Sequence, residues 1–237
     1  MAEDWVERLE QVSTATISMQ LLKRGLRSIA MQGVAPLTPG RRRLVGEAFT
    51  LRFIPGREDL SDPATLQRRD LAQRRAIETC PAGAILVVDA YARAHVGTIG
   101  DILAQRLVHR GVRGLVTDGA VRDAEGVIET GLDVYCAGTA APASISGLSD
   151  GDLQVPIGCG GVAVIPGDVV VGDGDGVVVI PRSLLGEVVE GAIEQERHER
   201  FIMRQIRSGA PVPGTYPPSE ENIAAYRDWL AKGEPDF

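Results

Sequence analysis

Two short apolar segments with a helical pattern between them constrain the fold of this chain most. Residues 83–90 (GAILVVDA) and 114–119 (GLVTDG) are bounded by turn residues, as is typical of buried strands. From about Asp101, apolar side chains recur at helical spacing, and Gly111 stands where a helix C-terminal cap belongs. The sequence therefore predicts a β-α-β unit, with residues 133–138 as the next strand.

The segments on either side of this unit predict a mixed α/β fold. Residues 43–53 alternate like a strand, and residues 161–181 have the pattern of short strands joined by tight Asp-Gly turns, with a hairpin turn at residues 172–176. A long helix is expected to begin with Ser183 as its N-cap and to end near Arg207. The strands thus lie on both sides of a helical crossover.

Three further segments are expected outside the core. Residues 4–31 have the apolar spacing of one or two short amphipathic helices, and residues 56–78 predict a charged surface helix. The few apolar anchors of that surface helix are Leu60, Leu66, Leu71 and Ile77. Prolines after residue 209 indicate an extended arm. Beyond Ser219, a short amphipathic helix is expected, with an apolar stripe formed by Ile223, Tyr226, Trp229 and Leu230.

The expected domain organisation follows from these segments. Residues 1–208 would form one catalytic domain with its core at about residues 40–182 and a long helix at residues 183–207. Residues 209–237 would form the proline-rich arm and its short helix.

Composition excludes several classes of function. The formal charge of −7 and the pI near 5.1 leave no basic excess to neutralise phosphates, so no nucleic-acid partner is expected. The three cysteines are odd in number and widely spaced, which indicates neither a disulfide framework nor a zinc site. No apolar run approaches the roughly 20 residues of a spanning helix, so no membrane is expected either. We expect a cytoplasmic protein that acts on small metabolites.

Glycine-rich and histidine motifs give little support to other chemistries. Neither GTIGD nor GDGDG has the order of a dinucleotide-binding loop, and no phosphate-binding P-loop motif occurs. His95, His109 and His198 have no partner at ligand spacing, which argues against a histidine-based zinc site or a hydrolytic triad. A surface position is expected for each histidine.

The pairs Gly100-Asp101 and Arg122-Asp123 carry the strongest indication of a site. In a parallel sheet, the N-terminus of the crossover helix and the end of the next strand lie at the same edge, so the two pairs should be neighbours. Backbone N–H groups of residues 100–103 could bind a carboxylate, Arg122 could bind its oxygens or a ketone, and Asp123 offers a hard oxygen ligand to Mg²⁺ or Mn²⁺. These groups suit a 2-oxo acid.

A purely structural alternative remains open on spacing alone. In it, Asp101 is only a helix N-cap, and Arg122 and Asp123 form a salt bridge within a turn.

The same stretch resembles a known family. In the RraA-like proteins, which include the class II 4-hydroxy-4-methyl-2-oxoglutarate / 4-carboxy-4-hydroxy-2-oxoadipate aldolases, an acidic residue is followed after twenty positions by Arg-Asp. Here Asp101, Arg122 and Asp123 match this pattern within GVRGLVTDGAVRD, and the later VVVGDGDGVVVIPR is also similar. The resemblance covers roughly residues 40–207. It implies an α/β fold of the swivelling β/β/α type, a mixed-sheet domain with N-terminal helices and a C-terminal arm.

The resemblance also implies a role for each matching residue. Gly100, Asp101, Ile102 and Leu103 would hold the carboxylate of the pyruvyl group. Arg122 would contact the substrate oxygen, Asp123 would bind the Mg²⁺ or Mn²⁺ ion, and Asp101 would position a proton-shuttling water. An acidic residue from the long helix of a neighbouring subunit completes the site in the family, and Glu196 and Glu199 are both candidates here.

The implied activity is metal-dependent cleavage of a 4-hydroxy-2-oxo acid to pyruvate and a second carbonyl compound, with oxaloacetate decarboxylation as a side activity. A homo-oligomer, trimeric or hexameric, is implied as well. The alternatives are a non-enzymatic RraA-type regulator of ribonuclease E, a binding module with a vestigial site, and a lyase for a sugar-acid-derived 2-oxo acid. The charged segment 56–78 and the arm depart from compact family members, and either could reshape the distal part of the pocket.

Overall fold

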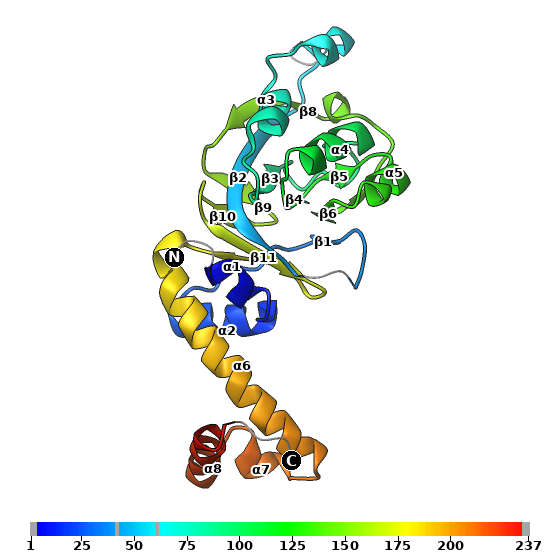
Figure 1. The fold of residues 1–237 in the computed structure, drawn as a ribbon. Coiled ribbons are helices and arrows are strands. Elements are labelled where there is room, and N and C mark those ends of the chain that lie inside the picture. The colour runs from blue at the N-terminus through cyan, green and yellow to red at the C-terminus, as the bar shows by residue number, and fades with distance from the viewer. Residues whose placement is uncertain (1–3, 41–42, 60–61, 234–237) are drawn as a thin grey trace. The chain divides into compact units, whose positions relative to one another are not determined.

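The computed structural model describes residues 4–40, 43–59 and 62–233. Its centre is a mixed eight-stranded sheet in the order β1-β6-β4-β3-β2-β11-β12, with β8 paired to β2 (Figure 1). The strands are β1 Ala35–Pro36, β2 Leu44–Pro55, β3 Ile85–Asp89, β4 Gly114–Thr117, β6 Asp133–Cys136, β8 Leu148–Leu153, β11 Val169–Asp173 and β12 Gly176–Ile180. Strands β2, β3, β4 and β6 are parallel neighbours, and the remaining pairs are antiparallel.

The predicted β-α-β unit is confirmed. Strand β3 leads to helix α4 (Asp101–His109), which returns to the parallel strand β4. Side chains alternate along β3, so Leu86 and Val88 join the core on the side of α4, whereas Ile85 and Val87 join the core on the opposite face. The C-terminal end of α4 is followed by Gly111 at φ +77°, as expected of a helix cap.

Smaller elements surround the sheet, and the pair β9 and β10 packs on the face opposite α4. They are helices α3 (Ala72–Thr79) and α5 (Ala124–Glu129), the 3₁₀ turn η2 (Ser144–Ser146), the parallel pair β5 (Ala120–Val121) and β7 (Gly138–Thr139), and the antiparallel pair β9 (Ile157–Cys159) and β10 (Val162–Val164). The mixed α/β fold class expected from the sequence is therefore confirmed.

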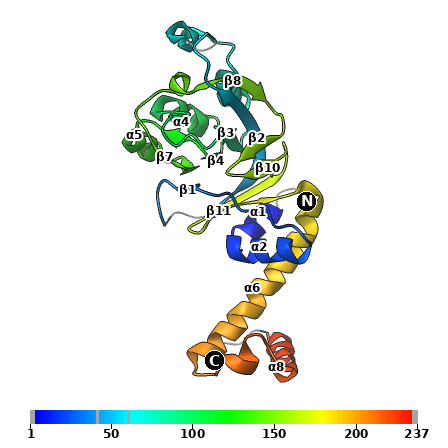
Figure 2. The same ribbon diagram turned by 180° about the vertical axis from the view of Figure 1, so that it is seen from behind.

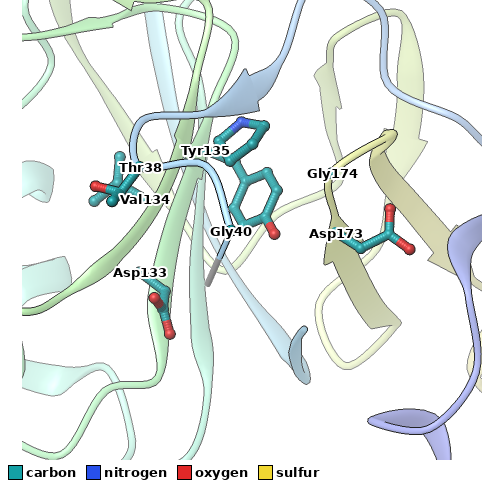
Figure 3. Close-up of a pocket in the computed structure, with 8 residues that line it drawn as sticks. Thr38, Gly40, Asp133, Val134, Tyr135, Asp173 and Gly174 are labelled. Atoms are coloured by element: carbon teal, nitrogen blue, oxygen red, sulfur yellow. The ribbon is translucent and has the colours of Figure 1, made fainter. Parts of the chain in front are cut away.

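A short hairpin connects β11 and β12, as predicted. Asp173 pairs with Gly176, which leaves Gly174 and Asp175 as a two-residue turn. Tyr135 of β6 packs its ring over Gly172 of this hairpin, where a Cβ atom would lie 2.8 Å from the Tyr135 Cζ. Figure 3 shows the cavity lined by Tyr135, Asp173 and Gly174 beside this contact. Its volume is only about 20 Å³, which is the space of a single water molecule rather than of a substrate.

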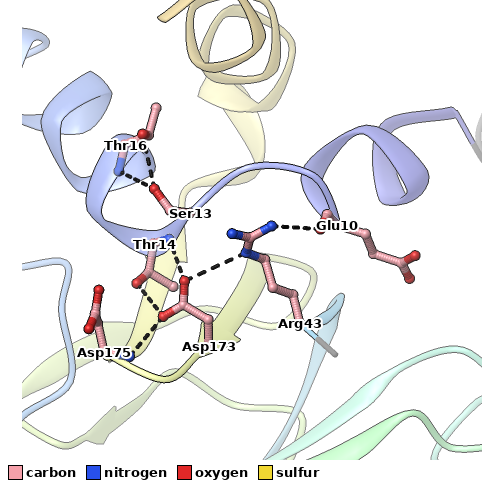
Figure 4. A network of polar contacts seen from close by, with 7 residues as sticks. All are labelled: Glu10, Ser13, Thr14, Thr16, Arg43, Asp173 and Asp175. Carbon is pink, nitrogen blue, oxygen red and sulfur yellow. Dashed lines mark hydrogen bonds and ion pairs between the residues drawn. The ribbon is translucent and has the colours of Figure 1, made fainter. Parts of the chain in front are cut away.

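The N-terminal helices α1 (Asp4–Leu9) and α2 (Thr14–Lys23) confirm the prediction of two short helices, although helical structure ends at Lys23 rather than near residue 31. Asp173 ties α2 to the hairpin, because it accepts hydrogen bonds from the Thr14 N–H (2.8 Å) and hydroxyl (2.7 Å) and from the Asp175 N–H (3.0 Å) (Figure 4). The guanidinium of Arg43 stands 3.7 Å from the same carboxylate. Figure 2 shows the two helices beside β11 from the opposite side.

The predicted surface helix over residues 56–78 is only partly correct. The structure has a 3₁₀ turn, η1 (Pro63–Gln67), and then α3, with extended chain between them. The Asp62 carboxylate accepts from the Thr65 N–H (2.9 Å) and starts η1, while Asp150 accepts from the Ala72 N–H (2.9 Å) and starts α3. Two separate caps thus break the segment in two. Leu71 and Ile77 are buried as predicted, and Leu60 lies outside the described residues.

Ser183 is not the N-cap of the long helix, contrary to the prediction. It lies inside a 3₁₀ turn, η3 (Arg182–Leu184), and α6 (Leu185–Arg207) begins after that turn. The Leu184 N–H donates to the Pro181 carbonyl, so the chain already turns before α6 begins.

Contacts divide the chain into two compact units, residues 1–189 and 190–237. The second unit holds most of α6 together with α7 (Val212–Thr215) and α8 (Glu220–Ala231). The short helix expected beyond Ser219 is confirmed as α8, and Ser219 is its N-cap. An extended arm was expected here, but α8 folds back along α6, because Tyr226 and Trp229 bury their rings against Phe201. The expectation that residues 1–208 form one catalytic domain stays a prediction.

Within the described residues, no helix combines the length and the apolar character that crossing a bilayer requires.

Candidate active site

The structure brings the Gly-Asp and Arg-Asp pairs together. The Thr98 N–H donates to the Ala120 carbonyl (2.7 Å), and the Arg122 N–H donates to the Ile99 carbonyl (2.8 Å). Gly97 forms isolated bridges with Ala120 and with Ala143. Three segments that are distant in the sequence therefore meet at the N-terminus of α4, as the parallel β-α-β geometry predicts.

Three glycines make room for the three side chains of the motif. A Cβ atom at Gly97 would overlap the Cγ of Arg122, and one at Gly100 would lie 2.7 Å from the Asp123 Oδ2. A Cβ atom at Gly126 would lie 2.9 Å from the Cβ of Asp101. None of these positions needs a glycine for its φ angle, so space is the reason for the residue type.

The N-terminus of α4 is a positively polarised backbone site. Its N-cap is Gly100, which has no side chain to cap the helix, so Asp101 is the first helical residue and not the cap. The Asp101 carboxylate accepts from the Ile102 N–H (2.7 Å), and the Gly100 carbonyl accepts from Ala104. For the N–H groups of Asp101 and Leu103, the described part of the chain offers no acceptor, so they remain available to an anion.

Arg122 lines a cavity of about 180 Å³ next to this helix end. The cavity is also lined by Gln73, Arg74, Gly97, Thr98, Ile99, Gly100, Leu103, Ala143 and Ser144. The Arg122 side chain is half-buried, and its Nε atom is buried without a hydrogen-bond partner among the described residues. Because a buried charged donor without an acceptor is costly, this arrangement favours an anionic or strongly polar ligand.

Asp123 follows directly and has an unusual backbone. Its φ of +50° lies in the left-handed region, which non-glycine residues adopt rarely and at a cost in strain. The exposed side chain does not cap α5, and it forms no ion pair within the described ranges. In particular, Arg122 and Asp123 form no salt bridge with each other there. The structural alternative of a salt-bridged turn is therefore not what the structure contains.

Asp123 is the residue that could hold a divalent metal. The residues described contain no cluster of three or more His, Cys, Asp or Glu side chains with the geometry of a complete metal site. Mg²⁺ commonly binds through one or two carboxylates and takes its other ligands from water and substrate. Asp123 lines a neighbouring cavity of about 580 Å³ rather than the Arg122 cavity, although its Oδ2 lies against Gly100, which lines the Arg122 cavity. One unpaired carboxylate at this position fits that kind of site, so the donor set agrees with Mg²⁺ or Mn²⁺.

Helix α3 contributes two side chains that the sequence analysis did not single out. Gln73 is buried, and its Nε2 donates to the Thr98 carbonyl (2.5 Å). Arg74 is half-buried and lines the same cavity as Arg122. The apolar stripe of α3 could have placed the helix against the core, but nothing local in the sequence indicates which turn faces the site.

The histidines, the cysteines and the two candidate glutamates of α6 do not line the Arg122 cavity. His95 and His109 are exposed as predicted, whereas His198 is half-buried and stacks on Tyr226 at 4.4 Å between ring centroids. All three cysteines are free and buried, and burial raises the pKa of the Cys80 thiol to about 12. Glu196 and Glu199 lie on α6 in the second unit, so their predicted role in the site of a neighbouring subunit stays a prediction.

Comparison with known proteins decides the family. A family model described as "RraA-like: Aldolase/RraA" matches residues 14–179. The chain belongs to the Aldolase/RraA family. The resemblance drawn from the twenty-residue spacing is thus confirmed, and the Asp101, Arg122 and Asp123 positions all fall within the matched segment.

Three relatives illustrate the range of this family. A protein of Halalkalibacterium halodurans, provisionally named a 4-hydroxy-4-methyl-2-oxoglutarate aldolase, is 28% identical over 97% of this chain and 95% of its own length. Protein DlpA of Legionella pneumophila is 27% identical over 95% of this chain, which spans only 34% of that protein. The crystal structure of Streptomyces coelicolor RraAS2, described as an unusual member of the RNase ES inhibitor RraA family, is 38% identical and superimposes with a TM-score of 0.75 over 84% of this chain and 94% of its own.

Proposed function

We propose that this Aldolase/RraA family member is a divalent-metal-dependent lyase that cleaves a 4-hydroxy-2-oxo acid to pyruvate and a second carbonyl compound. The observation that carries the proposal is the buried Nε of Arg122, which lacks a partner among the described residues and lines a cavity at the N-terminus of α4. A cationic donor and free backbone N–H groups together form a site for a 2-oxo carboxylate.

The chain would bind the two ends of the pyruvyl group with different groups. The backbone N–H groups at Asp101 and Leu103 would hold the carboxylate, and the Arg122 guanidinium would donate to the oxygen of the 2-oxo group. Holding both groups at once fixes the plane of the substrate, so that the bond between C3 and C4 can align with the carbonyl system.

Cleavage then needs a proton to leave and another to arrive. The proton of the 4-hydroxyl group passes to a water held by Asp101, the C3–C4 bond breaks, and its electron pair moves into the carbonyl system of the pyruvyl half as an enolate. Protonation at C3 gives pyruvate, and the other half leaves as an aldehyde or ketone. Asp123 would hold the Mg²⁺ or Mn²⁺ ion, which, when bound, supplies Lewis-acid stabilisation of the negative charge on the 2-oxo group.

The same arrangement would decarboxylate oxaloacetate. There the bond between C3 and C4 breaks with loss of carbon dioxide, and the electron pair moves into the same carbonyl system. No Schiff-base lysine is required, and neither Lys23 nor Lys232 lies in the motif region.

The test is pyruvate release from a panel of 4-hydroxy-2-oxo acids, including sugar-acid-derived ones, and from oxaloacetate, with and without Mg²⁺ or Mn²⁺. We expect metal-dependent release by the natural chain and its loss in Arg122→Ala, while Arg75→Ala, an exposed arginine on α3, behaves like the natural chain. Absence of cleavage for every compound would refute the proposal.

One observation favours a second candidate function. The 38% identity, over 84% of this chain, to RraAS2, whose family is described as RNase ES inhibitors, is higher than the 28% identity to the aldolase-named relative over 97% of this chain. As a regulator, the chain would slow an RNase E-type endonuclease without cleaving any 2-oxo acid. Measuring RNA cleavage by such an enzyme with and without this chain separates the two candidates.

As an aldolase, the chain is further proposed to act as a homotrimer or hexamer with sites shared between subunits. Light scattering tests this directly, since a monomer with full activity would contradict it.

A further inference from the structure

A second cavity, with a volume of about 470 Å³, lies beyond the Arg122 cavity. The two cavities share two lining residues, Arg74 and Leu103, and the second is also lined by Arg69, Ile77 and Ile102. Ile102 is 80% exposed although it is a large apolar residue in the first turn of α4. A substrate held by its pyruvyl half at Arg122 would therefore extend past Arg74 and over an apolar surface.

Some of the arginines that line this second cavity are paired with carboxylates, and others are not. Arg68 forms two hydrogen bonds with Asp70 (3.0 and 2.6 Å), and Arg106 forms a similar pair with Glu78 (3.0 and 2.7 Å). Such bidentate pairs use the donors that each guanidinium would offer to a ligand.

Arg69 and Arg74 also line the cavity, and within residues 4–40, 43–59 and 62–233 neither has a carboxylate partner. Two positive charges thus remain uncompensated on one wall. Arg74 is half-buried and lies where the two cavities join, whereas Arg69 is exposed on the rim.

The backbone that carries Arg74 is fixed on both sides. Asp150 accepts from the Ala72 N–H with both carboxylate oxygens at 2.9 Å, and Gln73 is buried against the Thr98 carbonyl. The Cα of Arg74 is thereby held relative to residues 97–100, while its side chain is left without a protein anion. This is the arrangement expected of a residue that selects a ligand by charge.

We propose that Arg74, assisted by Arg69, selects substrates whose leaving half carries a negatively charged group, a carboxylate or a phosphate. The inference rests on the proposed lyase function and adds its specificity. Arg74 takes no part in bond cleavage, because the pyruvyl half stays at Arg122. It binds and orients the half that leaves as the aldehyde or ketone.

The experiment uses 4-hydroxy-2-oxo acids that share the pyruvyl half and differ at the far end, which is a carboxylate, a phosphate or an uncharged methyl group. The natural chain is compared with Arg74→Gln, and with Arg75→Gln as the matched control from the same helix. For the charged compounds, we expect Arg74→Gln to lower kcat/KM by about tenfold or more, mainly through KM, because one charge-assisted hydrogen bond is lost. The carboxylate and phosphate arms identify which anion the natural chain prefers.

For the uncharged compound, kcat/KM should change by less than about twofold in either variant, and Arg75→Gln should match the natural chain throughout. If the natural chain cleaves charged and uncharged compounds equally well, or if Arg74→Gln changes all of them by the same factor, the selectivity of Arg74 is refuted and the lyase function stands. If the natural chain cleaves none of the compounds, the lyase function is refuted and the inference with it.

Discussion

Two regions of the first unit each combine an arginine and an aspartate, and they differ in whether the aspartate carboxylate is paired. At the β11–β12 hairpin, the Asp173 carboxylate accepts three hydrogen bonds and faces Arg43. At the end of β5, neither Arg122 nor Asp123 makes an ion pair within the described residues, although the Nε atoms of Arg43 and Arg122 are both buried there without a hydrogen-bond partner.

The difference separates a structural site from a functional one. Folding stability favours polar groups that are fully paired, whereas a binding site must keep donors free for the ligand. The glycines agree with this distinction, because Gly97 and Gly100 leave space that Arg122 and Asp123 occupy, at some cost in backbone entropy. We therefore expect substitutions at Arg122 and Asp123 to reduce activity, and substitutions at Asp173 to reduce stability.

The largest effect is expected at Asp123. Asp123→Ala should lower turnover by at least about a hundredfold, because Lewis-acid stabilisation of the developing charge supplies several kcal/mol. Pyruvate release measured at saturating Mg²⁺ or Mn²⁺ checks this, with Glu129→Ala, an exposed carboxylate on α5, as the control. Undiminished activity of the natural chain in excess EDTA would contradict the assignment.

Arg122→Lys should be nearly as damaging as Arg122→Ala. A lysine keeps the charge but cannot reproduce the planar, two-donor geometry of the guanidinium, so we expect both variants to lose about tenfold to a hundredfold in kcat/KM. Steady-state kinetics are compared with thermal unfolding, which should be little changed, because Arg122 contributes no ion pair to the described fold. Natural kinetics in the lysine variant would make Arg122 a structural residue and remove the contrast with Asp173.

Gly97→Ala tests the position of Arg122 without replacing a charged residue. The added methyl would overlap Cγ of Arg122 and approach its Cδ at 2.9 Å, so the guanidinium must move out of the cavity. A displacement of this size should lower kcat/KM by about tenfold. Gly158→Ala is the control, since its Cβ would meet no atom within 4 Å. Equal activity of the two variants would show that Arg122 does not need its present position.

Much of this site could be predicted from sequence because the relevant constraints are local. The alternation of strand and helix patterns placed Asp101 and Arg122 at the same edge of a parallel sheet, and the structure confirms that arrangement. The same local rules predicted the hairpin at Asp173 and the helix cap at Gly111.

What could not be predicted depends on contacts between distant segments. The break between η1 and α3 follows from Asp150 capping Ala72 across 78 positions, and the apolar stripe of α8 is covered by Phe201 of the same chain. Arg74 lines the cavity from a helix that is held by distant contacts, of Gln73 with the Thr98 carbonyl and of the Ala72 N–H with Asp150. No periodicity within residues 56–78 contains that information, so a single continuous helix was the simplest expectation there.

The smallest effect on activity is expected at Asp173, where stability should change instead. Burial by itself would raise the pKa of this carboxyl, but the hydrogen bonds from Thr14 and Asp175 and the charge of Arg43 together lower it. A lowered pKa in the folded state means that the ionised group stabilises the protein above its unfolded pKa, and that this stability is lost as the pH falls through the folded pKa.

Asp173→Ala should therefore lower the free energy of unfolding by about 1–3 kcal/mol near pH 7. The difference from the natural chain should shrink only in acid, as the pH falls through the lowered pKa of the natural carboxyl and this group also becomes protonated. Urea unfolding at several pH values measures this, with Asp175→Ala as a control that keeps the Asp173 carboxylate. If Asp173→Ala instead abolished pyruvate release while leaving stability unchanged, satisfied polar contacts would not mark a structural site in this fold.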